Sequence, residues 1–348
     1  MKYFTFPLLV GLFAMATVIA STGVAYMHRW ATQRMLDIPN ERSSHTQPTP
    51  RGGGVLIVLV TLVGFWLIAP LMKINLLTPA LLAFSFSAIL IAVISWQDDQ
   101  HPLSNKIRFG VHSISALMVI LFIGYWQTIE LPLLYTFQID WVGIPLTFLW
   151  LIGLTNAYNF MDGIDGLAGG QALLSGLGWL TLGVLSDLPL FTLLGVLVAG
   201  SSLGFLIHNW PPARIFMGDV GSAFLGFTIA TLAVFGGLID ARLPVAGILM
   251  VWPFLFDTTF TILRRLRFGE NIFTAHRSHL YQRLVIAGWQ HRSVTLLYLG
   301  FALLGIGLAV GWIAALPGSA LAVFIIPPFC ALLLWQLVVS VEKRVAEF

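Results

Sequence analysis

The sequence consists of long apolar stretches separated by short polar segments. Eleven stretches are close to the length of about 20 residues that a helix needs to cross the hydrocarbon core of a bilayer. Most contain neither a charge nor the alternation of a membrane β-strand, so we expect an all-α polytopic membrane protein. The predicted spans are 4–27, 54–72, 76–97, 110–128, 141–156, 171–186, 190–207, 222–239, 244–263, 295–314 and 318–340.

Composition supports a membrane protein. Hydrophobic residues make up 58% of the chain and charged residues only 9%, against about 25% charged in soluble domains. The single cysteine, Cys330, excludes a disulfide scaffold. The net charge of +3 is too small to indicate a nucleic-acid partner. No internal repeat is apparent, and we expect one membrane domain over residues 1–348.

The distribution of basic residues predicts the orientation. With the N-terminus outside, 15 of the 18 lysines and arginines fall in inward segments. This bias predicts a periplasmic N-terminus, a cytoplasmic C-terminus and a multi-pass protein of the bacterial inner (plasma) membrane. A cleaved signal peptide is an alternative for the first stretch, but cleavage would export four arginines between residues 29 and 51.

Acidic residues gather on the same predicted cytoplasmic side. Only four of the fifteen, Glu130, Asp140, Asp187 and Asp240, fall in outward loops. Five polar segments from distant parts of the chain reach the inner side, which predicts a site assembled there.

The first two segments suit phosphate chemistry. Arg51 precedes three glycines at the mouth of a helix, where backbone N–H groups can surround an anion. Asp98 and Asp99 are adjacent carboxylates that repel unless a cation or metal relieves them. The alternatives are a helix cap with topogenic arginines for the first segment and a solvated helix end for the second.

The next two segments carry oxygen ligands. Asn156, Asn159, Asp162 and Asp165 recur every third residue, so neighbours share a helix face or align in a 3₁₀ turn. Their amide and carboxylate oxygens suit Mg²⁺ and a base or ribose. Asp219 lies between glycines at the opening of a span and is predicted to reach a metal. A polar helix cap is the alternative for both segments.

The fifth segment contains histidines and arginines at helical spacing. His276, His279 and Arg283 can share one helix face and grip a diphosphate. A zinc site is the weaker interpretation, because no third ligand lies nearby. Asp257, in an apolar stretch, is either functional or paired with Arg264.

Together these motifs resemble the polyprenyl-phosphate N-acetylhexosamine-1-phosphate transferases, a glycosyltransferase 4 type. The resemblance covers residues 37–294 and rests on four combined motifs. These are Pro48-Thr-Pro-Arg-Gly-Gly, Asp98-Asp99, Asn159-x-x-Asp162-Gly-x-Asp165-Gly-Leu and Phe216-Met-Gly-Asp-x-Gly-Ser.

The resemblance implies transfer of a sugar 1-phosphate from a UDP-N-acetylhexosamine to undecaprenyl phosphate, with release of UMP. It implies Mg²⁺, with Mn²⁺ as an alternative, held by Asp219 with Asn156 as a co-ligand. Catalytic roles fall on Asp98 and Asp99 at the lipid phosphate, and on Asp162 and Asp165 at the nucleoside side. Predicted substrate or phosphate contacts are Arg51, Asn159, His276, Arg277, His279 and Arg283. The resemblance leaves open whether the protein forms a homodimer.

Two departures concern the branch of the family. The sequence His276-Arg-Ser-His-Leu-Tyr-Gln-Arg replaces the triple histidine of the peptidoglycan enzyme, and eleven spans replace its ten. These features resemble the O-antigen and teichoic-acid branch, whose sugars include GlcNAc, QuiNAc and FucNAc. The alternative is the phospho-N-acetylmuramoyl-pentapeptide transferase of peptidoglycan synthesis.

Other classes fit less well. A secondary transporter would place ionisable groups near the middle of the membrane. A CDP-alcohol phosphotransferase would need an arginine after the Asp-Gly pattern of the third segment, where this chain has glycine.

Overall fold

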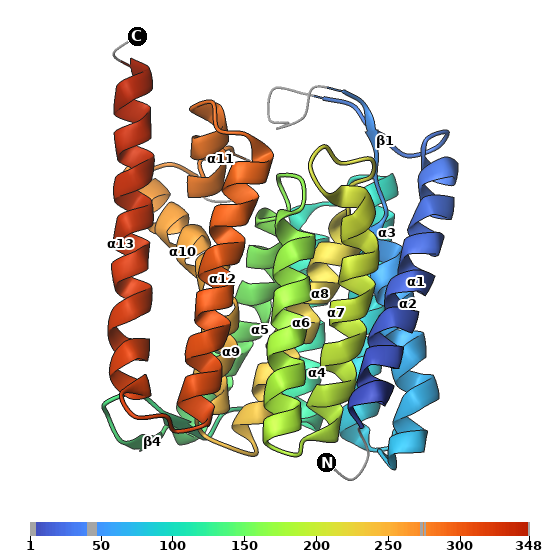
Figure 1. The fold of residues 1–348 in the computed structure, drawn as a ribbon, viewed down its shortest axis with the longest axis vertical. Helices are drawn as coiled ribbons and strands as arrows, with labels where there is room; N and C mark the ends of the chain where they lie inside the picture. The colour runs from blue at the N-terminus through green and yellow to red at the C-terminus, as the bar shows by residue number, and fades with distance from the viewer. Residues whose placement is uncertain (1–4, 40–46, 272–273, 275, 347–348) are drawn as a thin grey trace.

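The chain folds as a bundle of long, roughly parallel and antiparallel helices (Figure 1). The structure is a computed structural model that describes residues 5–39, 47–271, 274 and 276–346. The helices are α1 (Phe6–Ala31), α2 (Gly54–Ile68), α3 (Pro79–Gln100), α4 (Asn105–Phe122), α5 (Gly143–Phe160), α6 (Leu167–Leu185), α7 (Pro189–Asn209), α8 (Asp219–Gly237), α9 (Leu243–Met250), α10 (Trp252–Arg267), α11 (Leu280–Ile286), α12 (His291–Ile313) and α13 (Ser319–Ala346), with short 3₁₀ turns at Ala69–Met72 and Asp140–Val142.

The predicted all-α membrane architecture is confirmed. Among the described residues, ten helices are long and apolar enough to cross a membrane, and α9 with α10 forms an eleventh span bent by 76°. An odd number of spans places the two termini at opposite ends of the bundle, and in Figure 1 α1 begins at one end and α13 finishes at the other. The bend was not predicted, because the apolar run continues through it; Val251 breaks the helix and Pro253 enters the first turn of α10.

The helix at the centre of the bundle is α8. In its most apolar stretch of 18 residues, 94% is buried inside the protein, and α8 packs against α2, α3, α5 and α9. Small residues let the surrounding helices approach α8 closely: a Cβ added at Gly226 of α8 would lie 2.8 Å from the Leu154 carbonyl oxygen in α5. Such contacts are typical of membrane helix interfaces. They fix α8, whose first residue is Asp219.

Two small antiparallel hairpins lie at opposite ends of the bundle. Strands β1 (Leu36–Asp37) and β2 (Thr49–Pro50) pair between α1 and α2, and β3 (Thr128–Glu130) and β4 (Thr136–Gln138) pair between α4 and α5. In Figure 1 β1 lies at the end where α13 finishes, and β4 lies at the other. The first hairpin continues to Arg51, which pairs with Phe216 in the segment before α8.

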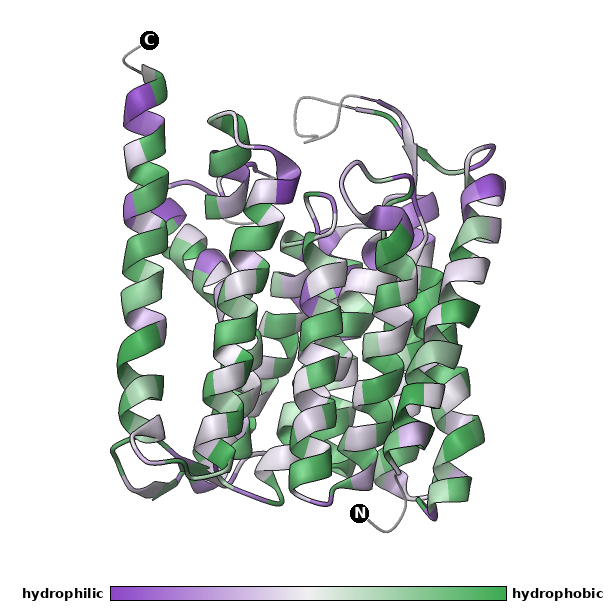
Figure 2. Ribbon diagram, in the orientation of Figure 1, coloured by the Kyte–Doolittle hydropathy of each residue, from purple (hydrophilic) through white to green (hydrophobic). Residues whose placement is uncertain are grey.

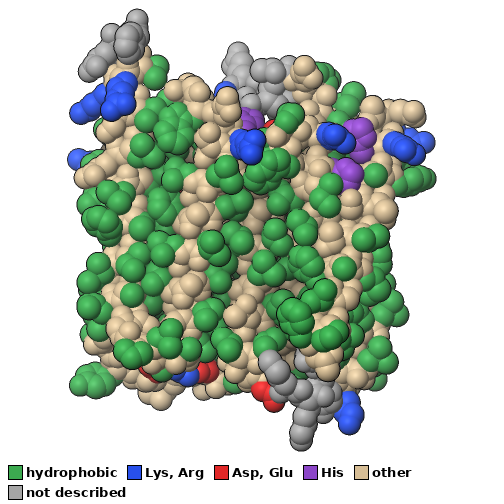
Figure 3. All heavy atoms as spheres, in the orientation of Figure 1, with side chains coloured by type: hydrophobic (Ala, Val, Ile, Leu, Met, Phe, Trp, Pro, Cys, Tyr) green, Lys and Arg blue, Asp and Glu red, His purple; other side chains and the backbone are tan. Residues whose placement is uncertain are grey.

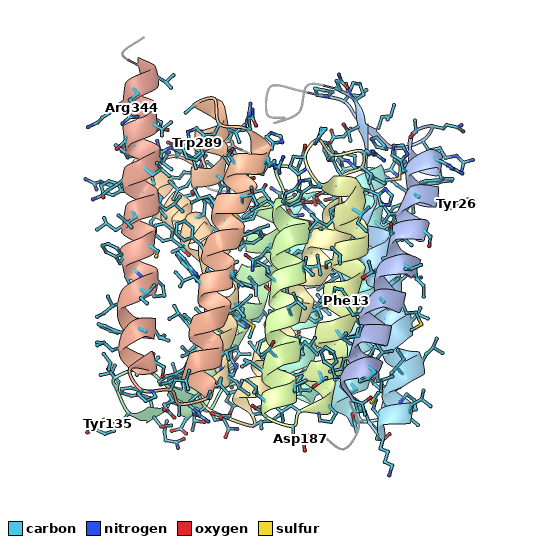
Figure 4. The ribbon with its side chains drawn as sticks, viewed as in Figure 1. Phe13, Tyr26, Tyr135, Asp187, Trp289 and Arg344 are labelled. Carbon is cyan, nitrogen blue, oxygen red and sulfur yellow. The ribbon has the colours of Figure 1, made fainter. Side chains whose placement is uncertain are left out.

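Hydrophilic residues are concentrated at the two ends of the bundle (Figure 2). The face shown in Figure 3 is a broad apolar band with lysines, arginines and histidines mainly along one edge, as expected for a surface in contact with lipid. Figure 4 places Arg344 and Trp289 near that edge and Asp187 and Tyr135 at the other. The cytoplasmic assignment of the basic edge stays a prediction.

Candidate active site

The polar segments singled out in the sequence meet around the start of α8. Hydrogen bonds join the end of α3, the start of α4 and the end of α5 to the first turn of α8. The segment before α8 is joined in turn to the β1–β2 hairpin and to the loop after α5. The fifth segment docks on the end of α5 through a hydrogen bond from the Tyr281 hydroxyl to the Phe160 carbonyl, 2.9 Å long.

Asp99 caps the first turn of α8. Its two carboxylate oxygens accept from the backbone N–H groups of Asp219 (2.9 Å) and Val220 (3.1 Å), and its side chain is fully buried. Gly218 makes the approach possible: its φ is +78°, and a Cβ there would lie 2.6 Å from an Asp99 oxygen. A carboxylate at this position satisfies helix-terminal donors and interacts favourably with the helix dipole.

Asp98 points to a different partner. Its oxygens accept from the backbone N–H of Leu103 (2.6 Å) and from Nη1 of Arg108 (3.0 Å). The same Arg108 nitrogen lies 3.3 Å from Oδ2 of Asp219, so one guanidinium bridges the two carboxylates. The repulsion within the acidic pair is therefore relieved by Arg108, the kind of cation that the sequence analysis allowed beside a metal, and by backbone donors.

The regular Asn/Asp repeat does not form one face. Asn159 Nδ2 donates to the Ser222 hydroxyl (3.0 Å), and its side chain also contacts Asp219. Asn156, one turn earlier, donates to the Ile152 carbonyl (2.8 Å) and pairs with His112 of α4. Asn159 is thus the amide beside Asp219, where the sequence had favoured Asn156.

The two aspartates that follow differ in their surroundings. No described residue donates a hydrogen bond to the Asp162 carboxyl, whose pKa is raised well above its usual range by burial and then by the negative charges of Asp219 and Asp99. Asp165 instead accepts from the Ala213 N–H (3.0 Å) and lies 3.4 Å from His291 Nδ1. Asp162 is available to a ligand, while Asp165 ties together the loops on which the site is built.

The three glycines after Arg51 do not surround an anion. The N–H groups of Gly52 and Gly53 donate to the Phe216 carbonyl (3.1 and 2.9 Å), and that of Gly54 donates to the Met217 carbonyl (2.9 Å). These donors are occupied, so the predicted anion cradle is wrong. The side chain of Arg51 contacts the Asp37 carboxylate (2.6 Å) and lies 3.8 Å from Asp99.

The fifth segment is a loop followed by a short helix, so the predicted single face for His276, His279 and Arg283 is wrong. His279 is the residue before α11, and its Nδ1 lies 3.1 Å from Oδ1 of Asp257. Arg283 points to α13 and forms a two-pronged ion pair with Glu342.

The other residues of the segment lie close by. Burial, followed by the charges of His279 and Arg265, lowers the pKa of His276 to about 4. Arg277 is half-buried and lies close enough to Tyr281 to interact with it electrostatically.

Two contributors were not identified from the sequence. Arg108 looked like one more topogenic arginine, although its place three residues into a helix after an acidic pair could have indicated it. Asp257 was left between two interpretations; it contacts His279, not Arg264, whose guanidinium lies over the Phe268 ring.

A divalent ion would need ligands from the substrate. Within the part of the chain that the structure describes, no three His, Cys, Asp or Glu side chains stand close enough to hold a metal by themselves. This argues against the zinc interpretation, since structural and catalytic zinc sites carry at least three protein ligands.

Comparison with known proteins gives a consistent result. Residues 81–237 match the model of glycosyl transferase family 4. The chain is 35% identical over 270 residues to the probable undecaprenyl-phosphate N-acetylglucosaminyl 1-phosphate transferase of Bacillus subtilis, covering 76% of this chain and 74% of the relative. It is 32% identical over 300 residues to the decaprenyl-phosphate N-acetylglucosaminephosphotransferase of Mycobacterium leprae (78% and 75%). It is 28% identical over 316 residues to a phospho-N-acetylmuramoyl-pentapeptide-transferase of Synechococcus (85% and 89%).

Proposed function

This chain belongs to the polyprenyl-phosphate N-acetylhexosamine-1-phosphate transferases of glycosyl transferase family 4, and on that basis we propose the reaction in detail. The donor is a UDP-N-acetylhexosamine and the acceptor is undecaprenyl phosphate. An oxygen of the lipid phosphate attacks the β-phosphorus of the donor, the bond from that phosphorus to the bridging oxygen breaks, and UMP leaves. The single observation that carries the proposal is that Asp98, Asn159 and Asp162 all interact with Asp219 at the start of α8.

The described residues provide the positioning and electrostatic stabilisation that phosphoryl transfer requires. Arg108 neutralises Asp98 and Asp219, and its position allows it to exchange a carboxylate for a phosphate oxygen. Arg51 supplies a second cation beside Asp99. His276, Arg277 and His279 are proposed to bind the diphosphate from the opposite side. Since a lipid phosphate is already largely ionised at neutral pH, Asp98 is proposed to orient it rather than to remove its proton.

We propose Mg²⁺ as the cofactor, with Mn²⁺ as a substitute. The residues fit a hard cation: the carboxyls of Asp162 and Asp219 interact repulsively, Asp162 has no donor among the described residues, and the Asn159 side chain adjoins Asp219. Asp219 and Asp162 would hold the ion, which when bound would neutralise charge on the diphosphate. Asn156 is a weaker candidate than Asn159 because its amide nitrogen is bonded within α5.

The sugar is proposed to be GlcNAc, with 6-deoxy sugars such as QuiNAc or FucNAc as alternatives, and the product to start O-antigen or another surface polysaccharide. Two of the relatives above carry GlcNAc in their names. A peptidoglycan role is the second candidate, because another relative is a pentapeptide transferase. A secondary transporter is disfavoured, because the clustered ionisable groups lie at one end of the bundle (Figure 2). The site is proposed to face the cytoplasm of a bacterial inner membrane.

The test is UMP release by purified protein in detergent, with undecaprenyl phosphate, Mg²⁺ and a panel of donors. The panel contains UDP-GlcNAc, UDP-QuiNAc, UDP-FucNAc and UDP-MurNAc-pentapeptide. We expect release that requires lipid and metal together and is fastest with UDP-GlcNAc. Fastest release with the pentapeptide donor would establish the peptidoglycan role instead. Folded protein that releases no UMP with any of these donors would refute the proposed reaction.

A further inference from the structure

A buried carboxylate on α10 is the centre of a hydrogen-bond network that the proposed reaction does not use. Asp257 is fully buried, and donors from α10, α11 and α12 surround it. Its Oδ1 accepts from His279 Nδ1 (3.1 Å), the Leu280 N–H (2.9 Å) and the Thr261 hydroxyl (3.2 Å), and its Oδ2 accepts from the Tyr281 N–H (3.0 Å) and the Tyr298 hydroxyl (2.6 Å). A buried carboxylate needs such donors to stay ionised.

Part of this network is structural. The N–H groups of Leu280 and Tyr281 are the first two of α11, and like all helix-terminal donors they require acceptors. Capping α11 would need nothing more than these two contacts. The contact with His279 is additional, because the imidazole lies beside the carboxylate and belongs to the residue that precedes the helix.

The carboxylate determines which nitrogen of His279 carries the proton. An ionised carboxylate has only acceptors, so Nδ1 of His279 must bear the hydrogen of the 3.1 Å contact. Nε2 is then left either with a lone pair or, in the imidazolium form, with a second N–H. Asp257 fixes the tautomer and orientation of the ring through this contact, in the way a carboxylate orients the histidine of a catalytic triad.

The His279 ring is buried beside the end of α5. Its centroid lies 6.2 Å from the ring of Phe160 at the end of α5, two residues before Asp162, and 5.1 Å from that of His276. Tyr281 locks this arrangement through its 2.9 Å hydrogen bond to the Phe160 carbonyl. An anionic phosphate offers only acceptors, and therefore it repels a neutral Nε2 and binds a protonated one.

We propose that Asp257 is a positioning residue that acts through His279. It holds Nδ1 protonated and fixes the ring, and Nε2, when protonated, donates to a phosphate oxygen of the bound nucleotide sugar. Asp257 does not touch the substrate. The inference rests on the proposed function for the identity of that ligand, whereas the tautomer depends only on the protein.

The kinetic test is a double-mutant cycle with Asp257→Asn and His279→Asn. His279→Asn keeps a donor for the carboxylate while removing Nε2. Asp257→Asn alone is expected to lower kcat by about 10- to 100-fold, the usual effect of losing a residue that orients a ligand-binding histidine. In the His279→Asn background the same change should cost less than about threefold, because the two residues act as a unit. An equal loss in both backgrounds would show that Asp257 only supports the fold.

Tyr298→Phe is the matched control, since it removes a short hydrogen bond from the same carboxylate but leaves His279 in place. It should reduce thermal stability while kcat stays within about threefold of wild type, given that the Asp257–His279 pair is intact. A fall in kcat as large as that of Asp257→Asn would attribute the effect to general loosening and overturn the inference.

A spectroscopic test needs neither turnover nor a folded Asp257 variant. In protein labelled with ¹⁵N-histidine in lipid nanodiscs, the resonances of His279 are identified by their loss in His279→Asn. We expect Nδ1 to be protonated. A neutral ring with its proton on Nε2 would refute the inference even if UMP release is normal, whereas absent UMP release with protonated Nδ1 would refute only the proposed function.

Discussion

The contact between Gly54 at the start of α2 and Gly221 in the first turn of α8 leaves no room for a side chain. A Cβ added at Gly54 would lie 2.5 Å from the Cα and 2.7 Å from the backbone N of Gly221, and 2.8 Å from the Met217 carbonyl oxygen. All three atoms are backbone, so no side-chain rotation can relieve the overlap. Ordinary carbon–carbon contacts are about 3.5–4.0 Å, and Gly54→Ala must therefore push α2 and α8 apart by roughly 1 Å.

The size of the effect follows from two opposing contributions. Overpacking costs about 1–3 kcal/mol, and rigid backbone contacts favour the upper end of that range. Alanine in place of a helical glycine returns at most about 1 kcal/mol. We expect a net loss of about 2 kcal/mol, which for a chain of this length lowers the melting temperature by about 3 °C. Because α8 begins with Asp219, the same shift should lower kcat by up to about 10²-fold.

The measurements are the melting temperature in detergent and the kinetics of UMP release. The control is Gly153→Ala in α5, where an added Cβ meets no atom within 4 Å. It should leave both quantities unchanged or raise the melting temperature slightly. If Gly54→Ala instead raised the KM for the donor with an unchanged melting temperature and kcat, the glycines would act as an anion cradle and the packing explanation would be refuted.

Four further outcomes are expected. Removing divalent metal with EDTA should abolish UMP release, and adding Mg²⁺ should restore it. In the Asp219→Ala variant, added Mg²⁺ should not restore UMP release. UMP release by metal-free enzyme would contradict the metal assignment. Arg108→Leu leaves Asp98 and Asp219 without their shared cation, so kcat should fall by about 10²-fold, and an unchanged kcat would exclude a role in charge neutralisation. The raised pKa of Asp162 keeps its carboxyl protonated to higher pH in the absence of metal. Because metal binding must displace that proton, the Mg²⁺ concentration for half-maximal activity should fall as pH rises from 6 to 8. A Mg²⁺ requirement that does not change with pH would contradict this explanation. Glu342→Gln weakens the ion pair with Arg283; the partly exposed pair should contribute about 1 kcal/mol or less, so a loss of activity comparable to that of the Arg108 variant would show that α13 has a larger role.

The spans were predictable because each is a single apolar run of bilayer length. The bend between α9 and α10 was not, since Leu243–Met250 and Trp252–Arg267 read as one continuous stretch. What breaks the helix is the local geometry at Val251. Hydropathy reports burial in apolar surroundings, and it is insensitive to the direction in which a buried helix runs.

The site was predictable in location and less so in its contacts. The gathering of polar segments on one predicted membrane face indicated that Asp98, Asn159 and Asp162 would lie near Asp219, as they do, but the interpretation of the glycines after Arg51 was wrong. A run of glycines indicates close approach of backbone, and the sequence does not say whether the approaching group is a phosphate or another part of the chain. Here it is the carbonyls of Phe216 and Met217, more than 160 residues away along the sequence.

Two buried carboxylates of this protein occupy equivalent positions in separate parts of the site. Asp99, at the end of α3, accepts from the first two N–H groups of α8, and Asp257, in α10, accepts from the first two of α11. In both cases the helix that is capped carries a candidate site residue at its start, Asp219 on α8 and His279 immediately before α11. Since a capped helix terminus is fixed in position as well as stabilised, each of these acids sets the place of a candidate site residue at the start of another helix. The adjacent acids of the sequence therefore have separate roles in the structure: Asp98 is joined to Asp219 through Arg108, and Asp99, like Asp257, caps the helix that carries a candidate site residue.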